Sequence, residues 1–276
     1  MKIVTVFRGL LAFLTAIPVK MDESFLDISA RYMYLFPVIG AVIGFLVGVY
    51  GFVANKVMFF VFENLNNLLF SGGHEIFFDF AAKGLAGIVT MAFLLAIIGL
   101  QHTDGLVDVG NALGIRNASL KEKMDIAHVW TVTPTGAFFA LAVSFLTFLL
   151  IFLTNNASII PSLIVAEVCA KLAMVTTAWQ GSSPPEKLED KRGKGRSFID
   201  FIRKNNKLYT VSLIISLGFS VALFGLTGVF AVATGILVGA FMIVLANRVF
   251  GGVNGDIFGA TNEIARMCAL FVVVFL

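Results

Sequence analysis

The sequence predicts an all-α fold: a polytopic integral membrane bundle of about seven transmembrane helices, with a short N-terminal helix that is interfacial or reaches half the depth of the bilayer. Hydrophobic residues make up 58% of the 276 positions, and 29 of them are Phe. Charged residues make up 13%, about half the share of a soluble domain. Runs of roughly 20 apolar residues, long enough to cross a bilayer as helices, recur along the chain. These three observations predict a single transmembrane domain, residues 1–276.

The first apolar stretch, Ile3 to Val19, is short, contains Arg8 and is closed by Pro18. Its length and its internal cation predict the short N-terminal helix, which we expect in the interface or at half depth. Because the stretch lacks a small-residue cleavage site, we expect no cleavable signal peptide.

Seven longer apolar runs predict the membrane spans. The first run carries Gly40, Gly44, Gly48 and Gly51 near helical spacing, which lets another helix approach closely in lipid. Residues 56–79 are rich in Phe and Asn and predict a loop or an amphipathic segment. The fifth and sixth runs follow each other with almost no connector. The seven predicted spans are Leu35–Ala54, Phe80–Leu100, Pro134–Leu153, Ser158–Trp179, Leu208–Thr227, Gly228–Asn247 and Ile257–Leu276.

Basic residues are distributed unevenly between the two sides of this predicted bundle. Three of them, Lys83, Lys171 and Arg266, fall within spans, and the side opposite the N-terminus holds only Lys56. All others lie on the N-terminal side: Lys2, Arg8, Lys20, Arg31, Arg116, Lys121, Lys123, Lys187, Lys191, Arg192, Lys194, Arg196, Arg203, Lys204, Lys207 and Arg248. Cytoplasmic loops carry the excess of positive charge, so we expect this side to face the cytoplasm from the cell (plasma) membrane.

Three polar segments lie on the expected cytoplasmic side, at residues 101–133, 181–207 and 248–263, and we expect them to be the catalytic loops. The first carries Gln101-His102-Thr103-Asp104-Gly105-Leu106-Val107-Asp108-Val109-Gly110-Asn111-Ala112. On a helix, Asp104 and Asp108 share one face, one turn apart. Two such carboxylates repel each other without a cation, and Mg²⁺ binds through one or two carboxylates plus phosphate oxygens. The spacing predicts a magnesium–diphosphate site, with an acidic helix cap as the alternative.

Two neighbours of these carboxylates extend the predicted site. His102 can contact phosphate, orient a carboxylate or act as a general base, or it can simply cap a helix end. Asn111, seven residues after Asp104, returns to the same helix face and can add a neutral oxygen ligand. His102, Asp104 and Asp108 are the catalytic candidates, and Asp104, Asp108 and Asn111 are the metal-ligand candidates.

The second polar segment is strongly basic. Four cations lie within the six residues from Lys191 to Arg196, interleaved with two glycines. Glycines let backbone N–H groups approach an anion, and Arg grips phosphate as a fork. Lys194 and Arg196 are therefore candidate substrate contacts. The alternative is a basic loop that contacts anionic lipid headgroups.

Further polar residues lie inside or at the start of spans. Glu167 and Lys171, one turn apart in the fourth span, form either a structural ion pair or a substrate contact. Asn254 and Asp256 open the last span, where Asp256 could also be a helix cap. Glu263 lies one to two turns further in, where an ionisable residue usually serves function. We treat all five as substrate-binding candidates.

Taken together, these stretches resemble the adenosylcobinamide-GDP ribazoletransferase family, also called cobalamin-5′-phosphate synthase. His102-Thr103-Asp104-Gly105-Leu106-Val107-Asp108 is similar to the family's His-x-Asp-Gly-x-x-Asp signature. The early Arg8 to Pro18 stretch, the basic Gly193-Lys194-Gly195 and the block from Gly251 to Ala260 are similar to other family motifs. The resemblance covers nearly the whole chain.

The resemblance implies a membrane transferase. A hydroxyl of α-ribazole, or of its 5′-phosphate, attacks the diphosphate of adenosylcobinamide-GDP, GMP leaves, and Mg²⁺ is the cofactor. The implied partners are these small molecules and membrane lipid, with no nucleic acid, and a homo-oligomer is left open. The chain departs from the family pattern at Asn111, where an Asp is usual, at residues 128–134, which lack a usual cation, and at Arg266, where Glu is common.

Two other classes share parts of this pattern. CDP-alcohol phosphotransferases and prenyltransferases also bind diphosphates through Mg²⁺ and paired Asp, but Val107-Asp108 stands where the phosphotransferase motif has Ala-Arg. A transporter without chemistry would use the intramembrane Glu167, Lys171 and Arg266 for translocation. That interpretation leaves the gathering of polar motifs on one side unexplained.

Overall fold

The computed structural model describes residues 3–19, 24–115, 117–127, 131–185 and 195–276. Regular secondary structure in these ranges is all helical. Six of the helices are long and apolar enough to cross a membrane, and the short apolar helix α1 (Ile3–Leu14) accompanies them. The predicted all-α, polytopic membrane bundle is confirmed.

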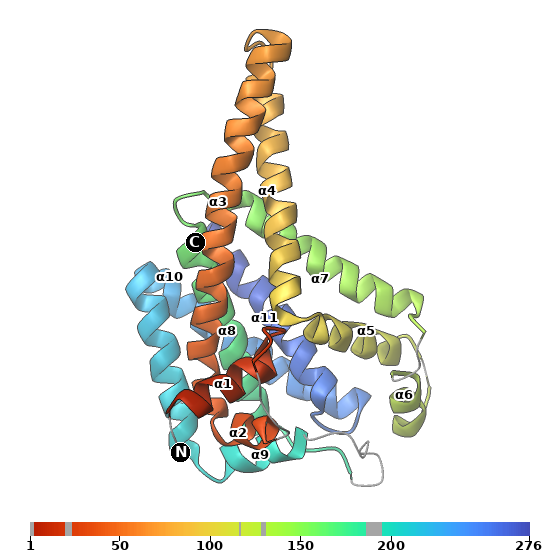
Figure 1. The fold of residues 1–276 in the computed structure, drawn as a ribbon. Coiled ribbons are helices and arrows are strands. Elements are labelled where there is room, and N and C mark those ends of the chain that lie inside the picture. Colours follow the sequence, from red (N-terminus) through yellow and green to blue (C-terminus); the bar gives the residue numbers. More distant parts are fainter. Residues whose placement is uncertain (1–2, 20–23, 116, 128–130, 186–194) are drawn as a thin grey trace.

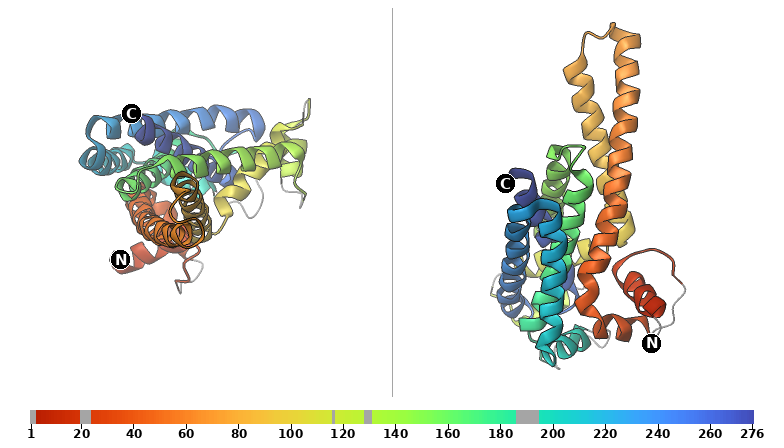
Figure 2. Two further views of the ribbon diagram at one scale, coloured as in Figure 1. Left: turned by 90° about the horizontal axis from the view of Figure 1, so that it is seen from above. Right: turned by 90° about the vertical axis from the view of Figure 1, so that its left-hand side faces the viewer.

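The longest feature is a hairpin made by α3 (Phe36–Phe70) and α4 (Glu75–Ile98). Its closed end projects well beyond the other helices (Figures 1 and 2). Of the two alternatives predicted for residues 56–79, a loop or an amphipathic segment, the loop was therefore wrong, because both helices continue through this stretch to a short turn. Contacts of Phe62 and Phe70 with Phe78 hold the two helices together there, and sequence composition alone does not reveal such pairing.

The most enclosed helix is α8 (Ile159–Gln180), which is buried along nearly its whole length. The glycines of α3 lie directly against it. A Cβ added to Gly44 would lie 2.3 Å from the carbonyl oxygen of Leu163, and one on Gly40 would lie 2.5 Å from that of Glu167. No side chain fits at such distances, so the two backbones are in direct contact, as the glycine spacing predicted.

Two predicted spans are joined in α10 (Asn206–Val249), which is interrupted at Gly225 with φ 56° and ψ −125°. Glycine adopts this conformation far more readily than other residues. Beyond it the chain folds back, because a Cβ on Gly228 would lie 2.0 Å from the carbonyl oxygen of Ser220. Since α10 contributes two antiparallel halves, the six long helices account for the seven predicted spans (Figure 1).

The two remaining long helices, α7 (Pro134–Leu153) and α11 (Gly255–Phe275), begin at defined caps. The hydroxyl of Thr133 accepts a hydrogen bond from the N–H of Gly136 at 3.1 Å, and Asn254 Oδ1 accepts one from the N–H of Ile257 at 3.0 Å. Such caps satisfy N–H groups that a helix start otherwise leaves unpaired. They fix where both helices begin.

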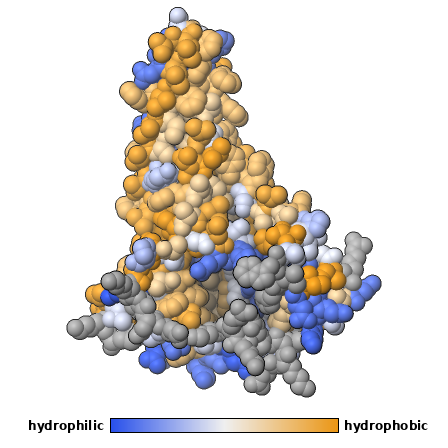
Figure 3. Space-filling view, turned by 45° about the vertical axis from the view of Figure 1, so that its right-hand side comes forward, coloured by the Kyte–Doolittle hydropathy of each residue, from blue (hydrophilic) through white to orange (hydrophobic). Residues whose placement is uncertain are grey.

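The short helices gather toward one end of the bundle, away from the hairpin tip (Figure 1). They are α1, α2 (Phe25–Arg31), the 3₁₀ turn η1 (Met33–Leu35), α5 (Gln101–Leu113), α6 (Leu120–Ala127) and α9 (Gly195–Arg203). Figure 3 shows much of the hydrophilic surface at this base, whereas the hairpin surface is largely apolar. We call this end the base of the bundle.

Candidate active site

The polar motif forms α5, which crosses α11 and also contacts α7. Gly105 lies at the crossing: a Cβ there would lie 2.5 Å from the carbonyl oxygen of Asp256. On the other helix, a Cβ on Gly259 would lie 3.1 Å from the Cα of His102. The two helices therefore meet backbone to backbone. This close contact explains why a glycine directly follows the first aspartate of the motif.

The crossing brings the part of α5 that carries Asp104 and Asp108 against the first turn of α11, which carries Asp256. Asp104 is exposed and Asp108 is half-buried, one turn further along α5. Asp256, also half-buried, lies in the first turn of α11, with its backbone against Gly105. Its Oδ2 accepts a hydrogen bond from Asn254 Nδ2 at 2.8 Å. Asn254 itself caps α11, so the side chain of Asp256 is not the one that accepts the cap hydrogen bond.

The protein offers few metal ligands at this crossing. Among the described residues, no group of three or more His, Cys, Asp or Glu side chains is placed to hold a metal ion. Asp104 and Asp108 thus form at most a two-carboxylate site. That donor set suits Mg²⁺, which usually keeps water and substrate phosphate oxygens in its remaining positions.

Asn111 is engaged with the segment that leads into α7. Its Oδ1 accepts hydrogen bonds from the N–H of Thr133 at 2.9 Å and from the Thr133 hydroxyl at 2.8 Å. Its Nδ2 donates to the carbonyl of Thr131 at 3.2 Å. These bonds tie the start of α7 to α5. The metal-ligand assignment of Asn111 stays a prediction, beside this positioning role.

Five polar side chains form a continuous buried network between α8 and α11. Lys171 Nζ donates to Glu167 Oε2 at 3.0 Å and to Asn262 Oδ1 at 2.6 Å. Arg266 Nη1 donates to Glu263 Oε2 at 2.5 Å, and its Nε donates to Glu167. Asn262 Nδ2 donates to Glu263 Oε1 at 3.1 Å. Two carboxylates balance two cations, which is the arrangement that makes buried charge tolerable.

His102 lies next to this network at the start of α5. It is 8% exposed, and its Nδ1 has no hydrogen-bond partner within the described part of the chain. Burial lowers the pKa of His102 well below its ordinary value, and the nearby cations of Lys171 and Arg266 lower it further. The imidazole is therefore neutral at physiological pH.

The basic segment reaches the described structure at α9. Lys194 lies outside the described residues, and Arg196, in the first turn of α9, donates from Nη2 to the carbonyl of Pro184 at 3.5 Å. Two residues later, Phe198 stacks on Phe13 with ring centroids 4.9 Å apart and lies 6.2 Å from the ring of Phe258. Because Phe258 is two residues after Asp256, this aromatic contact joins α9 to the start of α11.

Comparison with known proteins identifies the family of this chain. The family model described as cobalamin-5-phosphate synthase matches residues 6–274. The chain belongs to this family. The predicted family and enzyme class, a transferase of cobalamin biosynthesis, are confirmed, and the phosphotransferase, prenyltransferase and transporter alternatives are set aside.

Relatives of the cobalamin-5-phosphate synthase family match over most of their length. An adenosylcobinamide-GDP ribazoletransferase of Methanocella arvoryzae is 29% identical, over 95% of this chain and 92% of the relative. One of Methanococcoides burtonii is 29% identical, over 96% and 90%, and one of Thermoplasma acidophilum is 30% identical, over 69% and 72%. No solved structure gives a significant match.

Two members of the network were not among the site candidates drawn from the sequence of this cobalamin-5-phosphate synthase. Asn262 lies next to Glu263, and Arg266 lies three residues further along the same helix. The sequence did contain a signal for Arg266, because an intramembrane ionisable residue three positions after Glu263 shares its helix face. What the sequence did not show is that this face meets Glu167 and Lys171 of α8.

Proposed function

We propose that this cobalamin-5-phosphate synthase joins adenosylcobinamide-GDP to α-ribazole or α-ribazole 5′-phosphate, giving adenosylcobalamin or its 5′-phosphate with release of GMP. The observation that supports the proposal is the crossing of α5 and α11, where the backbone of Asp256 lies against Gly105, between Asp104 and Asp108 in the sequence. The names of the similar ribazoletransferases support the choice of substrates.

The donor set of the crossing fits Mg²⁺ as the cofactor. Asp104 and Asp108 present carboxylate oxygens one turn apart. Because Asp104 is exposed and Asp108 is half-buried, a substrate phosphate can reach a magnesium ion that both carboxylates bind. When bound, Mg²⁺ neutralises charge on the diphosphate. Asn111 and Asp256 are the additional oxygen donors in this proposal.

The remaining residues position the reactants and handle the proton. Phosphoryl transfer depends mainly on alignment and charge stabilisation. The neutral His102 accepts the proton of the attacking ribazole hydroxyl, and Lys194 and Arg196 hold the phosphate of the departing GMP.

The buried candidates act differently in this proposal. Glu167, Lys171 and Glu263 are at most 1% exposed, so we assign them to the positioning of α11 and of the substrate-binding residues at its start, Asn254 and Asp256. The uneven distribution of Lys and Arg supports a site that faces the cytoplasm from the cell membrane.

The test is a GMP-release assay with purified protein in liposomes, supplied with adenosylcobinamide-GDP and α-ribazole. We expect turnover that requires Mg²⁺ and is lost on chelation.

Asp104→Asn and Asp108→Asn should each lower kcat/KM by roughly 10²–10³-fold, the scale of a lost charge-stabilising group. Asp125→Asn, on the exposed side of α6, is the matched control and should stay near wild type. Wild-type turnover in either α5 variant would rule the assignment out.

A further inference from the structure

A stacked Trp and Tyr lie where two spans reach the base. Trp179, in the last turn of α8, stacks on Tyr209, in the first turn of α10, with ring centroids 4.0 Å apart and an interplanar angle of 9°. Its Nε1 donates a hydrogen bond to Asn206 Oδ1 at 3.0 Å. Trp and Tyr are enriched where a transmembrane helix leaves the hydrocarbon. The pair therefore marks the level at which α8 and α10 meet the membrane surface.

The length of α10 agrees with this level. Its first half runs from Asn206 to Phe224, before the reversal at Gly225. These 19 residues at about 1.5 Å each are about 28 Å long, close to the hydrocarbon thickness of about 30 Å. Residues next to Asn206 in the sequence therefore lie at the depth of the lipid headgroups on the side of the base (Figure 1).

Three exposed cations lie at this depth, in the connection between α9 and α10: Arg203, Lys204 and Lys207. Arg203 Nη1 donates to the carbonyl of Gly181, directly after α8, at 3.3 Å. This bond holds the guanidinium at the end of α8 and leaves it further N–H donors. Neither lysine has an ion-pair partner within the described part of the chain. Even with Asp200 counted, residues 200–207 carry a net charge of +2.

An apolar face of α10 continues from these cations along the span. Lys207, Val211, Ile214 and Gly218 follow each other at steps of three or four residues and share one face of the helix. Val211 is 38% exposed and Ile214 63%, and nothing lies within 4 Å of a Cβ added to Gly218. One surface of the protein thus changes from cationic to apolar over the depth at which a lipid changes from headgroup to acyl chain.

We propose that this surface binds an anionic phospholipid, whose headgroup phosphate contacts Arg203, Lys204 and Lys207 and whose acyl chains lie along the exposed face of α10. Charge complementarity identifies the occupant, because each Lys or Arg near an anionic lipid surface strengthens binding about fivefold. The site is separate from the candidate active site: Arg203 lies seven residues after Arg196 in α9, about 10 Å along the helix. The proposal is independent of the reaction.

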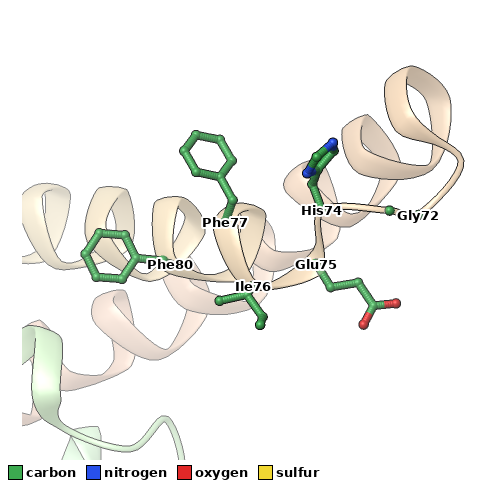
Figure 4. A pocket seen from close by; sticks show the side chains of 7 residues that line it. Gly72, His74, Glu75, Ile76, Phe77 and Phe80 are labelled. Atoms are coloured by element: carbon green, nitrogen blue, oxygen red, sulfur yellow. The ribbon is translucent and has the colours of Figure 1, made fainter.

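The depression at the other end of the molecule has the opposite chemistry. It lies at the tip of the α3–α4 hairpin and is lined by Gly72, Gly73, His74, Glu75, Ile76, Phe77 and Phe80 (Figure 4). Neither Lys nor Arg is among these residues, and a phosphate there would meet the carboxylate of Glu75. An anionic headgroup is therefore favoured at the base and disfavoured at the tip.

Quenching of Trp179 fluorescence by brominated lipids tests the proposal. The chain has two Trp, so Trp130→Phe leaves Trp179 as the sole emitter. The full-length protein is reconstituted into phosphatidylcholine liposomes in which brominated phosphatidylglycerol or brominated phosphatidylcholine replaces part of the lipid. We expect phosphatidylglycerol to bind beside Trp179 at least roughly tenfold more tightly than phosphatidylcholine. Equal quenching by the two brominated lipids would overturn the proposal.

A matched pair of double variants distinguishes a defined site from general attraction to the basic side. Lys204→Gln with Lys207→Gln should bring the preference for phosphatidylglycerol close to one, since each lysine contributes about fivefold. Lys121→Gln with Lys123→Gln removes the same charge from α6, also at the base, and should leave the preference unchanged. An equal loss in both double variants, or no loss in the first, would refute the site.

A last arm distinguishes the lipid from a soluble phosphate. In liposomes that contain brominated phosphatidylglycerol, an excess of inorganic phosphate or of GMP at constant ionic strength should leave the quenching unchanged, because the acyl chains hold the lipid in place. Relief of the quenching by either would mean that the cations bind a soluble phosphate, and would overturn the proposal. A single peak in size-exclusion chromatography shows that each variant is folded.

Discussion

Arg266 contacts both buried carboxylates of the network at once. It pairs with Glu263 on its own helix and with Glu167 on α8, while Lys171 reaches Glu167 and Asn262. Its Nη2 has no partner within the described residues, so the guanidinium retains one donor for a water or a polar ligand group. The network therefore depends on Arg266 more than on any other member for its charge balance.

Replacing Arg266 by Gln removes one cation and leaves two buried carboxylates to share Lys171. We expect the free energy of unfolding to fall by about 3–5 kcal/mol, the cost of breaking a buried ion pair on one side. The loss is measured as a lower midpoint temperature of aggregation in detergent, with size-exclusion chromatography as the readout. Adding Glu263→Gln should recover part of the loss, because it restores the charge balance; a double variant as unstable as the sum of both changes would contradict this account.

His102 gives the molecule a pH dependence of known sign. Burial keeps the pKa of His102 below its ordinary value, whereas in the unfolded chain a His protonates near pH 6.5. As the pH falls below about 6.5, the unfolded state takes up a proton that the folded state does not, so stability decreases. We expect the melting temperature to fall more between about pH 7.5 and 5.5 in wild type than in His102→Gln. Parallel curves would show that His102 is protonated in the folded protein.

Among the helices, glycines determine where two backbones touch. Gly40 and Gly44 place α3 against α8, and Gly105 and Gly259 place α5 against α11. The first contact builds the centre of the bundle, and the second builds the candidate site. In both, the missing side chain has a geometric reason that is independent of backbone flexibility.

A pair of Gly→Ala changes tests this account. At Gly44 the new methyl group would meet the Leu163 carbonyl at 2.3 Å, so α3 and α8 must separate, and we expect a loss of about 1–3 kcal/mol. At Gly218, in α10, nothing lies within 4 Å of the new atom. There the better helix propensity of Ala should stabilise by about 0.5–1 kcal/mol. Both effects are measured as shifts in thermal stability, and equal shifts would refute the packing argument.

Most elements were predictable, and their partners were not. Apolar length predicted the spans, and the Gly spacing predicted a close contact of α3, because both are properties of one helix. The extension of α3 to Phe70 escaped prediction because it rests on the packing of Phe62 and Phe70 against Phe78 of the next helix. At the site, the carboxylate pair on α5 was visible in the spacing. Its position against α11, and the pairing of Arg266 with Glu167 across 99 residues, depend on tertiary contacts that no local pattern contains.

At the scale of the whole molecule, polar chemistry and apolar projection lie at opposite ends. The site residues and the short helices lie toward the base, and the hairpin extends from the other side (Figure 1). Because α10 reverses at Gly225, we expect the six long helices to make seven crossings of the membrane. An odd number of crossings would put Met1 and Leu276 on opposite sides.

Reporter fusions test this arrangement. A fluorescent protein that matures only in the cytoplasm should be bright when fused before Met1 and dark when fused after Leu276. Alkaline phosphatase, which is active only outside the cytoplasm, should show the reverse, since the excess of Lys and Arg predicts a base that faces the cytoplasm. The same fluorescence from both ends would mean that one half of α10 does not cross.

The reversal at Gly225 also constrains biosynthesis. The two halves of α10 have no loop between them, so neither can be anchored while the other is still being translated in isolation. We therefore expect the two halves to enter the bilayer as a hairpin, and the side from which α11 starts depends on that insertion. The conformation of a single glycine thus decides on which face of the membrane α11 begins.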